Sequence, residues 1–221
     1  MENVAKKSDP KTWLQYCSRK RITHQWMQLN LLARTDAKDV LEVGPAMGAV
    51  TALLDNAGYC VTTLDFTDQQ FDSPKVAHIK RNILDVEASE IAGHDAIVCC
   101  ETLEHIPYDS VDRVVRAFRD SGARHLLVSV PYMAFQVTFA LYFNAHTFTQ
   151  YFSMKKLRFL RSFVPEPGFG HQWEVGYRGY KLESWEAKLE RCGYRIISRE
   201  FTEHCRSVFH LLERRTLSDG S

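Results

Sequence analysis

The sequence predicts an α/β domain built on a mostly parallel β-sheet, and three observations support this. First, five short apolar runs recur along the chain, and each ends in a turn or near a carboxylate. Second, the earliest run leads through a glycine-bearing loop into a segment with helical spacing. Third, residues 194–199 and 207–212 read as a closing antiparallel pair of strands. Strands that alternate with helices are typical of parallel sheets. The five predicted strands are residues 40–43, 60–64, 76–79, 95–100 and 125–130.

The loop after the first predicted strand has the composition of a ligand-binding turn. Gly44 and Gly48 lie four residues apart, and residues 50–57 behind them have helical spacing. Glycine adopts positive φ and lets a ligand approach the backbone closely. A strand that leads into a helix through such a loop is where an open α/β sheet binds a nucleotide. Glu42 stands where its carboxylate could receive a cationic amino group. The alternative is an ordinary tight turn, because glycine marks turns generally.

The middle of this loop separates two kinds of nucleotide site. A dinucleotide enzyme is expected to have the motif Gly-x-Gly-x-x-Gly, in which the second glycine makes room for a pyrophosphate. This chain has Ala46 at the middle position. Because the alanine narrows that space, the loop favours a nucleoside ligand that carries no phosphate.

The spacing Glu42-x-Gly44-x-x-x-Gly48 resembles the cofactor motif of the class I S-adenosylmethionine-dependent methyltransferases, with Ala46 where that family usually has a glycine. The resemblance extends over about residues 36–214. It implies a Rossmann-like methyltransferase fold: a mostly parallel seven-stranded sheet, helices on both faces and an antiparallel last strand. It also implies S-adenosyl-L-methionine as the cofactor.

Two further segments carry the resemblance toward small-molecule enzymes. The triplet Leu103-Glu104-His105 after the fourth predicted strand closely resembles the post-strand motif of small-molecule methyltransferases, including the ubiquinone-biosynthesis O-methyltransferases. The pair Pro131-Tyr132 after the fifth predicted strand is also similar to that family. The implied activity is transfer of a methyl group to a small-molecule acceptor.

The resemblance implies cofactor-binding roles at the strand ends. Asp65 follows the second predicted strand, where a carboxylate can accept both ribose hydroxyls, and Phe66 could stack on the adenine. Asn82 lies where the family usually has an acid that meets the adenine amino group. Asp85 is the neighbouring candidate, or else a cap. Glu101 is expected beside the methionyl group. The expected cofactor-binding residues are Glu42, Gly44, Pro45, Ala46, Gly48, Asp65, Phe66, Asn82, Ile83 and Glu101.

Two segments lie outside the minimal domain. Residues 1–35 are predicted to form an N-terminal helical cap that covers a core edge or, alternatively, the cofactor. Residues 133–175 are rich in aromatic and basic side chains and follow the fifth predicted strand, at the edge of the sheet where ligands bind. We expect this insert to build the acceptor pocket. The alternative is a helical subdomain that simply packs, with its basic cluster on a solvated helix face or facing an anionic or membrane-surface acceptor.

Methyl transfer requires few reactive groups from the protein. An acceptor oxygen or nitrogen attacks the sulfonium methyl in line and expels a neutral thioether, so the chain mainly aligns the reactants. A hydroxyl acceptor benefits from a base with a pKa near the working pH, which histidine supplies. We expect His105 and His171 in this role, with His146 as a third candidate, although each could be structural. Transfer to oxygen is the simplest reading. N-methylation of an amine or amino sugar and a non-catalytic cofactor-binding protein are the alternatives.

Composition limits the remaining classes. A formal charge of +1 gives no reason to expect nucleic-acid binding. No apolar run reaches the roughly 18 residues of a membrane span, and the polar start does not resemble a signal peptide, so a cytoplasmic location is expected. The 6 cysteines include no Cys-x-x-Cys pair, so no metal site is expected from them. Nothing in the sequence specifies an oligomeric state.

Overall fold

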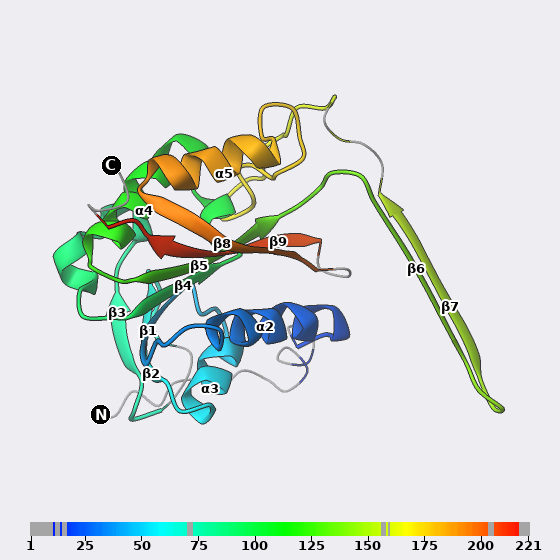
Figure 1. Cartoon of the computed structure of the whole chain (residues 1–221), viewed down its shortest axis with the longest axis horizontal. Helices are drawn as coiled ribbons and strands as arrows, with labels where there is room; N and C mark the ends of the chain where they lie inside the picture. Colours follow the sequence, from blue (N-terminus) through cyan, green and yellow to red (C-terminus); the bar gives the residue numbers. More distant parts are fainter. Residues whose placement is uncertain are drawn as a thin grey trace.

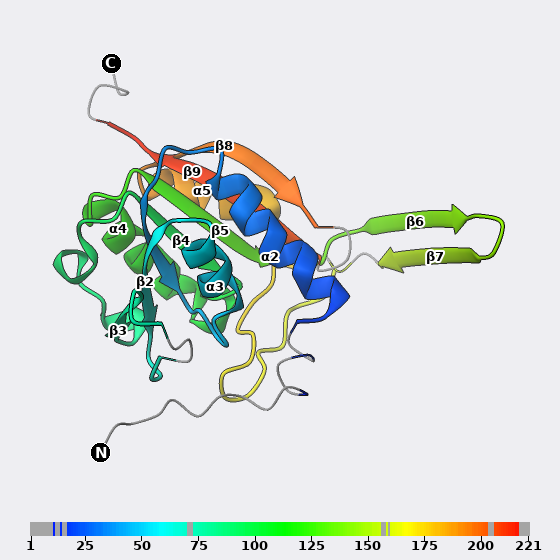
Figure 2. The ribbon, with the colours of Figure 1, turned by 90° about the horizontal axis from the view of Figure 1, so that it is seen from below.

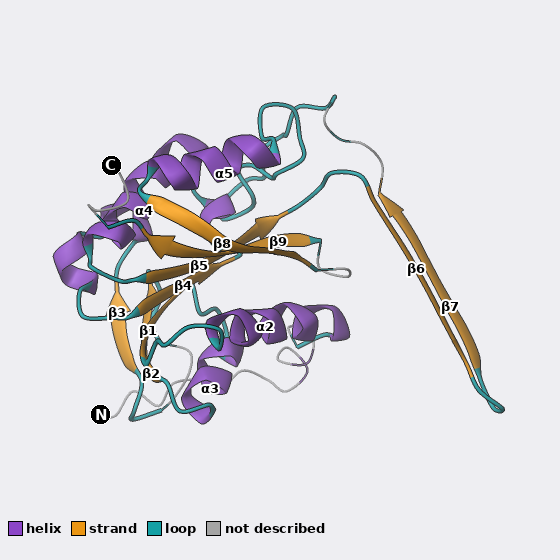
Figure 3. Ribbon diagram, in the orientation of Figure 1, coloured by secondary structure: helices purple, strands orange, loops and turns teal. Residues whose placement is uncertain are grey.

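The computed structural model describes residues 11, 14, 17–69, 73–155, 158, 160–202 and 206–216. Its centre is a seven-stranded sheet with the strand order β3-β2-β1-β4-β5-β9-β8, and helices cover both faces (Figures 1 and 3). The strands of this sheet are β1 Asp39–Val43, β2 Cys60–Asp65, β3 Ala77–Lys80, β4 Ala96–Cys100, β5 His125–Pro131, β8 Tyr194–Phe201 and β9 Ser207–Arg214. The α-helices are α2 Arg19–Leu32, α3 Ala49–Asn56, α4 Val111–Asp120 and α5 Leu182–Arg191. The short 3₁₀ helices are η1 Ile83–Asp85, η2 Ala88–Ile91, η3 Leu103–His105 and η4 Tyr108–Ser110.

The strand pairing confirms the predicted topology. The pairs β1–β2, β2–β3, β1–β4 and β4–β5 are parallel, whereas β9 runs antiparallel to both β5 and β8. The strand order reverses at β1: β2 and β3 lie on one side of it, and β4 and the remaining strands lie on the other. Such a reversal of strand order opens a crevice beyond the carboxyl ends of the strands. The glycine loop at the end of β1 lies at this crevice.

Two hydrophobic clusters hold the layers together, and the alternation of side chains along β1 divides them. Val40 contributes to the cluster beneath α2 and α3, whereas Leu41 contributes to the cluster beneath α4 and α5. Figures 1 and 2 show these helix pairs on opposite faces of the sheet. In α4 the buried side chains follow the i, i+3, i+4, i+7 spacing of an amphipathic helix. They are Val111, Val114, Val115 and Phe118.

The predicted helical cap is represented by α2, which lies against the sheet. Ser18 caps its first turn by accepting a hydrogen bond from the Arg21 backbone N–H at 3.4 Å. Leu31 and Leu32 are completely buried, while Trp26 is 57% exposed. Two other apolar positions of the N-terminal segment, Trp13 and Tyr16, lie outside the described residues.

The insert contains an antiparallel hairpin, so the alternative of a helical subdomain is wrong. Strands β6 Gln136–Phe143 and β7 Phe148–Lys155 pair only with each other. Figures 1 and 2 show this hairpin extending away from the rest of the molecule. In the described part of the chain, no helix has the length and apolar character needed to cross a membrane.

Candidate functional site

A cavity of about 540 Å³ opens at the carboxyl ends of β1, β2 and β4. Eight of the predicted site residues line it: Gly44, Ala46, Asp65, Phe66, Asn82, Ile83, Glu101 and His105. Sequence reasoning missed the other lining residues, which are Val43, Leu64, Arg81, Leu84, Thr102, Ile106 and Phe169. The other four predicted residues, Glu42, Pro45, Gly48 and His171, are not among those that line it.

The glycine loop has three residues in the left-handed region. Gly44, Ala46 and Gly48 have φ of 70°, 49° and 73°. A Cβ atom on Gly44 would lie 2.5 Å from Oγ1 of Thr102, so this position has room only for hydrogen. The Gly44 backbone N–H donates to the carbonyl of Leu64 at 2.9 Å, which ties the loop to β2. Ala46 adopts a conformation that ordinarily favours glycine.

Glu42 lies beneath the loop rather than in the cavity. Its side chain is buried, and Oε2 accepts a hydrogen bond of 2.6 Å from Oγ1 of Thr51 in α3. Burial raises the pKa of Glu42 to about 7, although the Thr51 hydroxyl acts in the opposite direction. In this arrangement Glu42 braces the loop against α3. Direct binding of an amino group by Glu42 stays a prediction.

Two polar side chains at the nucleoside end of the cavity are already partly engaged. Oδ1 of Asp65 accepts hydrogen bonds from the backbone N–H and the hydroxyl of Thr67, both at 2.8 Å. Binding of a ribose hydroxyl by the other carboxylate oxygen of Asp65 stays a prediction. Oδ1 of Asn82 accepts from the Leu84 N–H at 3.0 Å and caps η1. The backbone at Asn82 and Ile83 is therefore fixed at the cavity wall.

An aromatic pair lies over the same cavity. The rings of Phe66 and Phe169 stack with centroids 5.1 Å apart and an interplanar angle of 22°. Phe169 belongs to the insert, more than a hundred residues from Phe66 in the sequence, and is 78% exposed. The carbonyl of Phe169 also accepts a hydrogen bond of 2.6 Å from Nδ1 of His105. The insert thus contributes to the first cavity as well.

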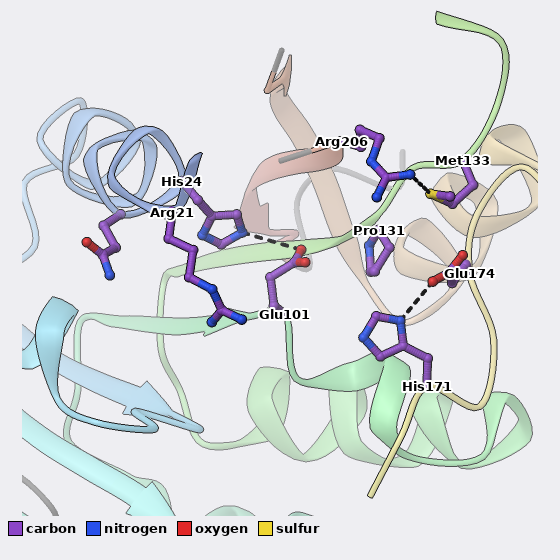
Figure 4. Close-up of a pocket in the computed structure, with 9 residues that line it drawn as sticks. Arg21, His24, Glu101, Pro131, Met133, His171, Glu174 and Arg206 are labelled. Atoms are coloured by element: carbon purple, nitrogen blue, oxygen red, sulfur yellow. Dashed lines mark hydrogen bonds and ion pairs between the residues drawn. The ribbon is translucent and has the colours of Figure 1, made fainter. Parts of the chain in front are cut away.

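A second cavity, of about 260 Å³, adjoins the first at Glu101, and Figure 4 shows the side chains that line it. Its lining is mostly polar and comes from α2, the ends of β4 and β5, the insert and the β8–β9 connection. The lining residues are Arg21, His24, Gln25, Glu101, Pro131, Met133, His171, Glu174 and Arg206. Glu101 lines both cavities. The aromatic side chains of the hairpin do not line this cavity; the insert supplies Met133, His171 and Glu174 instead.

Glu101 is held in place between the two cavities. Its φ is 51°, a value that is uncommon for a residue other than glycine. Oε1 accepts a hydrogen bond from the Ser129 hydroxyl at 3.1 Å. The same oxygen lies 3.4 Å from Nε2 of His24, a contact that Figure 4 shows. Burial raises the pKa of Glu101, but the hydrogen bond and the charge of His24 outweigh it, so the pKa is lowered overall. Glu101 is therefore a carboxylate at neutral pH.

The two predicted histidines meet at the boundary of the cavities, with ring centroids 5.0 Å apart. Nδ1 of His171 donates to Glu174 at 2.8 Å, and this hydrogen bond raises the pKa of His171 above its usual value (Figure 4). Both partners of Nδ1 are acceptors, so Nδ1 carries a proton in each ring, and the neutral imidazole has its lone pair on Nε2. The third candidate, His146, is exposed in the connection between β6 and β7 and lines neither cavity.

Glu104 completes this group. Its side chain is fully buried, and neither carboxylate oxygen has a hydrogen-bond partner among the described residues. Burial and the nearby charge of Glu101 raise the pKa of Glu104 well above its usual value. Glu104, His105 and His171 each offer a ligand atom, and these atoms lie within 4.8 Å of one another. The group could hold a cation, an arrangement that the expectation of no metal did not foresee.

Comparison with known proteins identifies the fold. No protein-family model and no curated protein matches the sequence. The structure nevertheless resembles the N-methyltransferase NodS from Bradyrhizobium japonicum WM9 in complex with S-adenosyl-L-homocysteine, with a TM-score of 0.63 and 13% sequence identity over 95% of this chain and 94% of that one. This chain has the class I methyltransferase fold.

Two other structures with the methyltransferase fold extend the comparison. An S-adenosylmethionine-dependent methyltransferase from Clostridium acetobutylicum ATCC 824 matches with a TM-score of 0.58 and 10% identity, over 93% of this chain and 98% of that one. The magnesium protoporphyrin IX methyltransferase ChlM from Synechocystis PCC 6803, solved with bound S-adenosylmethionine, matches with a TM-score of 0.57 and 13% identity, over 88% and 81%. The breadth of acceptors in these names leaves the acceptor of this chain to be argued from its own residues.

Proposed function

We propose that the protein is an S-adenosyl-L-methionine-dependent methyltransferase that acts on a polar small molecule, most simply at a hydroxyl oxygen. The observation that carries this proposal is the pair of adjoining cavities that share Glu101 as a wall. The larger one has the size and position of a nucleoside site at the edge of an open α/β sheet. The smaller one is lined by polar groups suited to an acceptor.

The proposed cofactor roles follow from the lining of the first cavity. Gly44 and Ala46 lie against the methionine portion, and Glu101 receives its ammonium group because it is an anion. Asp65 accepts a hydrogen bond from a ribose hydroxyl on its second carboxylate oxygen, because Thr67 donates only to Oδ1. Phe66 lies against the adenine. For this, its partner ring, Phe169, either moves aside or closes over the adenine. Glu42 supports the loop from below.

The proposed transfer balances with one base. The acceptor oxygen forms a bond to the sulfonium methyl as the carbon–sulfur bond breaks, and neutral S-adenosylhomocysteine leaves with the electron pair. The hydroxyl proton passes to Nε2 of His171, whose basicity is strengthened by Glu174 on the opposite ring nitrogen. His105 lines the first cavity and positions the acceptor from the other side.

A second candidate mechanism is favoured by the buried carboxylate of Glu104. Leaving an ionisable group buried without a partner is costly, and a bound cation removes that cost. Here Nε2 atoms of His105 and His171 would act as ligands with Glu104, while Phe169 and Glu174 hold the opposite ring nitrogens, as outer groups commonly do at metal sites. The cation would then bind the acceptor oxygen and favour its deprotonation.

The proposed function is tested in two steps with the purified full chain. Isothermal titration calorimetry should detect binding of S-adenosylmethionine and S-adenosylhomocysteine, and no binding would contradict the proposal. A screen with cofactor labelled in its methyl group, offering phenols, sugars, amines and lipid headgroups, then identifies the acceptor. Tight binding with no transfer would favour the non-catalytic alternative, and label only on nitrogen would favour N-methylation.

The two mechanisms are separated by a chelator. Treatment with EDTA should leave turnover unchanged if His171 acts as the base alone. Loss of turnover that Mg²⁺ or Mn²⁺ restores would favour the cation mechanism. The variant Glu104→Gln provides a matched check, because it should abolish the metal dependence while leaving cofactor binding intact.

A further inference from the structure

The hairpin formed by β6 and β7 has two unlike faces. In an antiparallel pair, residues directly opposite each other point to the same side, and successive residues alternate between sides. The register therefore assigns one face to Val137, Phe139, Leu141, Phe143, Phe148, Gln150, Phe152 and Met154. Seven of these eight side chains are hydrophobic. The opposite face is mainly polar and holds Gln136, Thr138, Ala140, Tyr142, Thr149, Tyr151 and Ser153. We call the first group the apolar face.

The apolar face is exposed along its whole length. Its hydrophobic side chains range from 51% exposed at Leu141 to 71% at Phe143. Figures 1 and 2 show the hairpin standing clear of the body in two perpendicular views, so the cores of the domain do not cover this face. A lone two-stranded hairpin is marginally stable in water, and a contiguous exposed apolar patch marks an interaction site.

The charge of the surrounding segment indicates what covers the face. Residues 133–165 contain no Asp or Glu, although the whole chain has 27 acidic residues. The same stretch contains four basic residues, all between positions 155 and 161: Lys155, Lys156, Arg158 and Arg161. An apolar, aromatic-rich surface followed by cations suits the boundary of an anionic bilayer, where rings enter the acyl edge and cations meet headgroups. A second copy of this chain would instead bring an identical positive segment.

We propose that the β6–β7 hairpin is a docking arm that lays its apolar face into an anionic lipid surface. The arm joins the body close to the second cavity, because Met133, three residues before β6, lines that cavity. Docking would therefore hold the second cavity near the lipid surface. The docking does not depend on methyl transfer and can be tested without it.

The test is co-sedimentation of the full chain with vesicles of phosphatidylcholine alone and of phosphatidylcholine with phosphatidylglycerol. We expect binding to the anionic vesicles, weaker binding to the neutral ones, and weakening of the anionic binding at about 0.5 M salt through screening. The double variant Phe139→Ser with Phe152→Ser removes one cross-strand pair from the apolar face and should reduce partitioning by tenfold or more. The control, Tyr142→Ser with Tyr151→Ser, removes two rings from the opposite face and should bind like the wild type.

A charge variant tests the second half of the proposal. Lys155→Gln with Arg161→Gln should reduce partitioning to anionic vesicles on the order of tenfold and leave neutral vesicles unaffected. Circular dichroism and the unfolding midpoint establish that each variant is folded. The proposal is overturned if the wild type stays in the supernatant or if the apolar-face variant binds as well as the wild type. It is also overturned if light scattering finds a dimer that this variant dissociates and no vesicle binding, since the face would then be an interface between copies.

Discussion

The two cavities are assembled from the sequence in different ways. The first is built mainly from the ends of β1, β2, β3 and β4 and the loops that follow them, so each group of lining residues is close together in the sequence. The second draws its residues from α2, the ends of β4 and β5, the insert and the β8–β9 connection. Apart from Phe169 of the insert, sheet topology brings the first set together, whereas the second set depends on packing between distant segments. The fold therefore fixes the first cavity more tightly than the second.

The largest effect should come from removing the proposed base in the second cavity. His171→Ala is expected to lower kcat by roughly 10²–10⁴-fold, because no nearby base then remains to take the hydroxyl proton of the substrate. Cofactor affinity measured by calorimetry should be unchanged, since His171 does not line the first cavity. His146→Ala, at the exposed connection of the hairpin, is the matched control. Equal kcat values for the two variants would remove His171 from the mechanism.

A substitution in the glycine loop should act on the first cavity instead. Gly44→Ala places a Cβ 2.5 Å from Thr102 Oγ1 at a residue with φ of 70°. We expect cofactor affinity to fall between tenfold and a hundredfold, on the scale of the cost of such strain. Gly58→Ala is the control, because Gly58 has φ of 92° but open space around it. Similar losses in both variants would show that the close approach to Thr102 is unimportant.

Asp65→Ala should weaken the cofactor by about tenfold or somewhat more, the scale of a hydrogen bond to a charged group. Calorimetry measures the loss of affinity for both S-adenosylmethionine and S-adenosylhomocysteine. A smaller loss for S-adenosylhomocysteine is expected only if the sulfonium charge contributes to the interaction with Asp65. At saturating cofactor, kcat should return close to the wild-type value. A persistent loss of kcat would mean that Asp65 also shapes the second cavity.

The smallest effect concerns pH. His171 accepts a proton only when neutral, so activity should rise with pH through its pKa, which the Glu174 hydrogen bond raises above the ordinary value of 6.5. Glu174→Gln removes the negative charge, lowers that pKa and should move the rising limb of the kcat profile to lower pH. An unmoved limb in this variant would indicate that another group, or a bound cation, controls the proton.

The reach of sequence reasoning follows the same division. The strand ends at Asp65 and Glu101 were predictable because turn residues directly follow apolar runs, and a parallel sheet brings such ends to one edge. His24 and Arg206 gave no such signal, since nothing local marks them as members of a cavity. His171 was predicted as a base, whereas Glu104 was named only as part of the Leu103-Glu104-His105 triplet and given no contact with His171. Only the folded chain brings their side chains together.

The hairpin illustrates a different difficulty. Val137, Phe139, Leu141 and Phe143 alternate with smaller or more polar residues, which is the period of a half-buried strand. Their aromatic content suggested packing into a pocket or a helical subdomain. The structure places them on an arm with no core beneath it. Periodicity identifies a face, but it does not say whether the protein itself or another surface covers that face.

Glu101 carries a last consequence, because its one carboxylate lines both cavities. If the ammonium group of a bound cofactor pairs with Glu101, the interaction between Glu101 and His24 changes. The lining of the second cavity, where the acceptor is proposed to bind, changes with it. The dissociation constant of each substrate should therefore depend on whether the other is bound. Inhibition by S-adenosylhomocysteine should likewise depend on what occupies the second cavity.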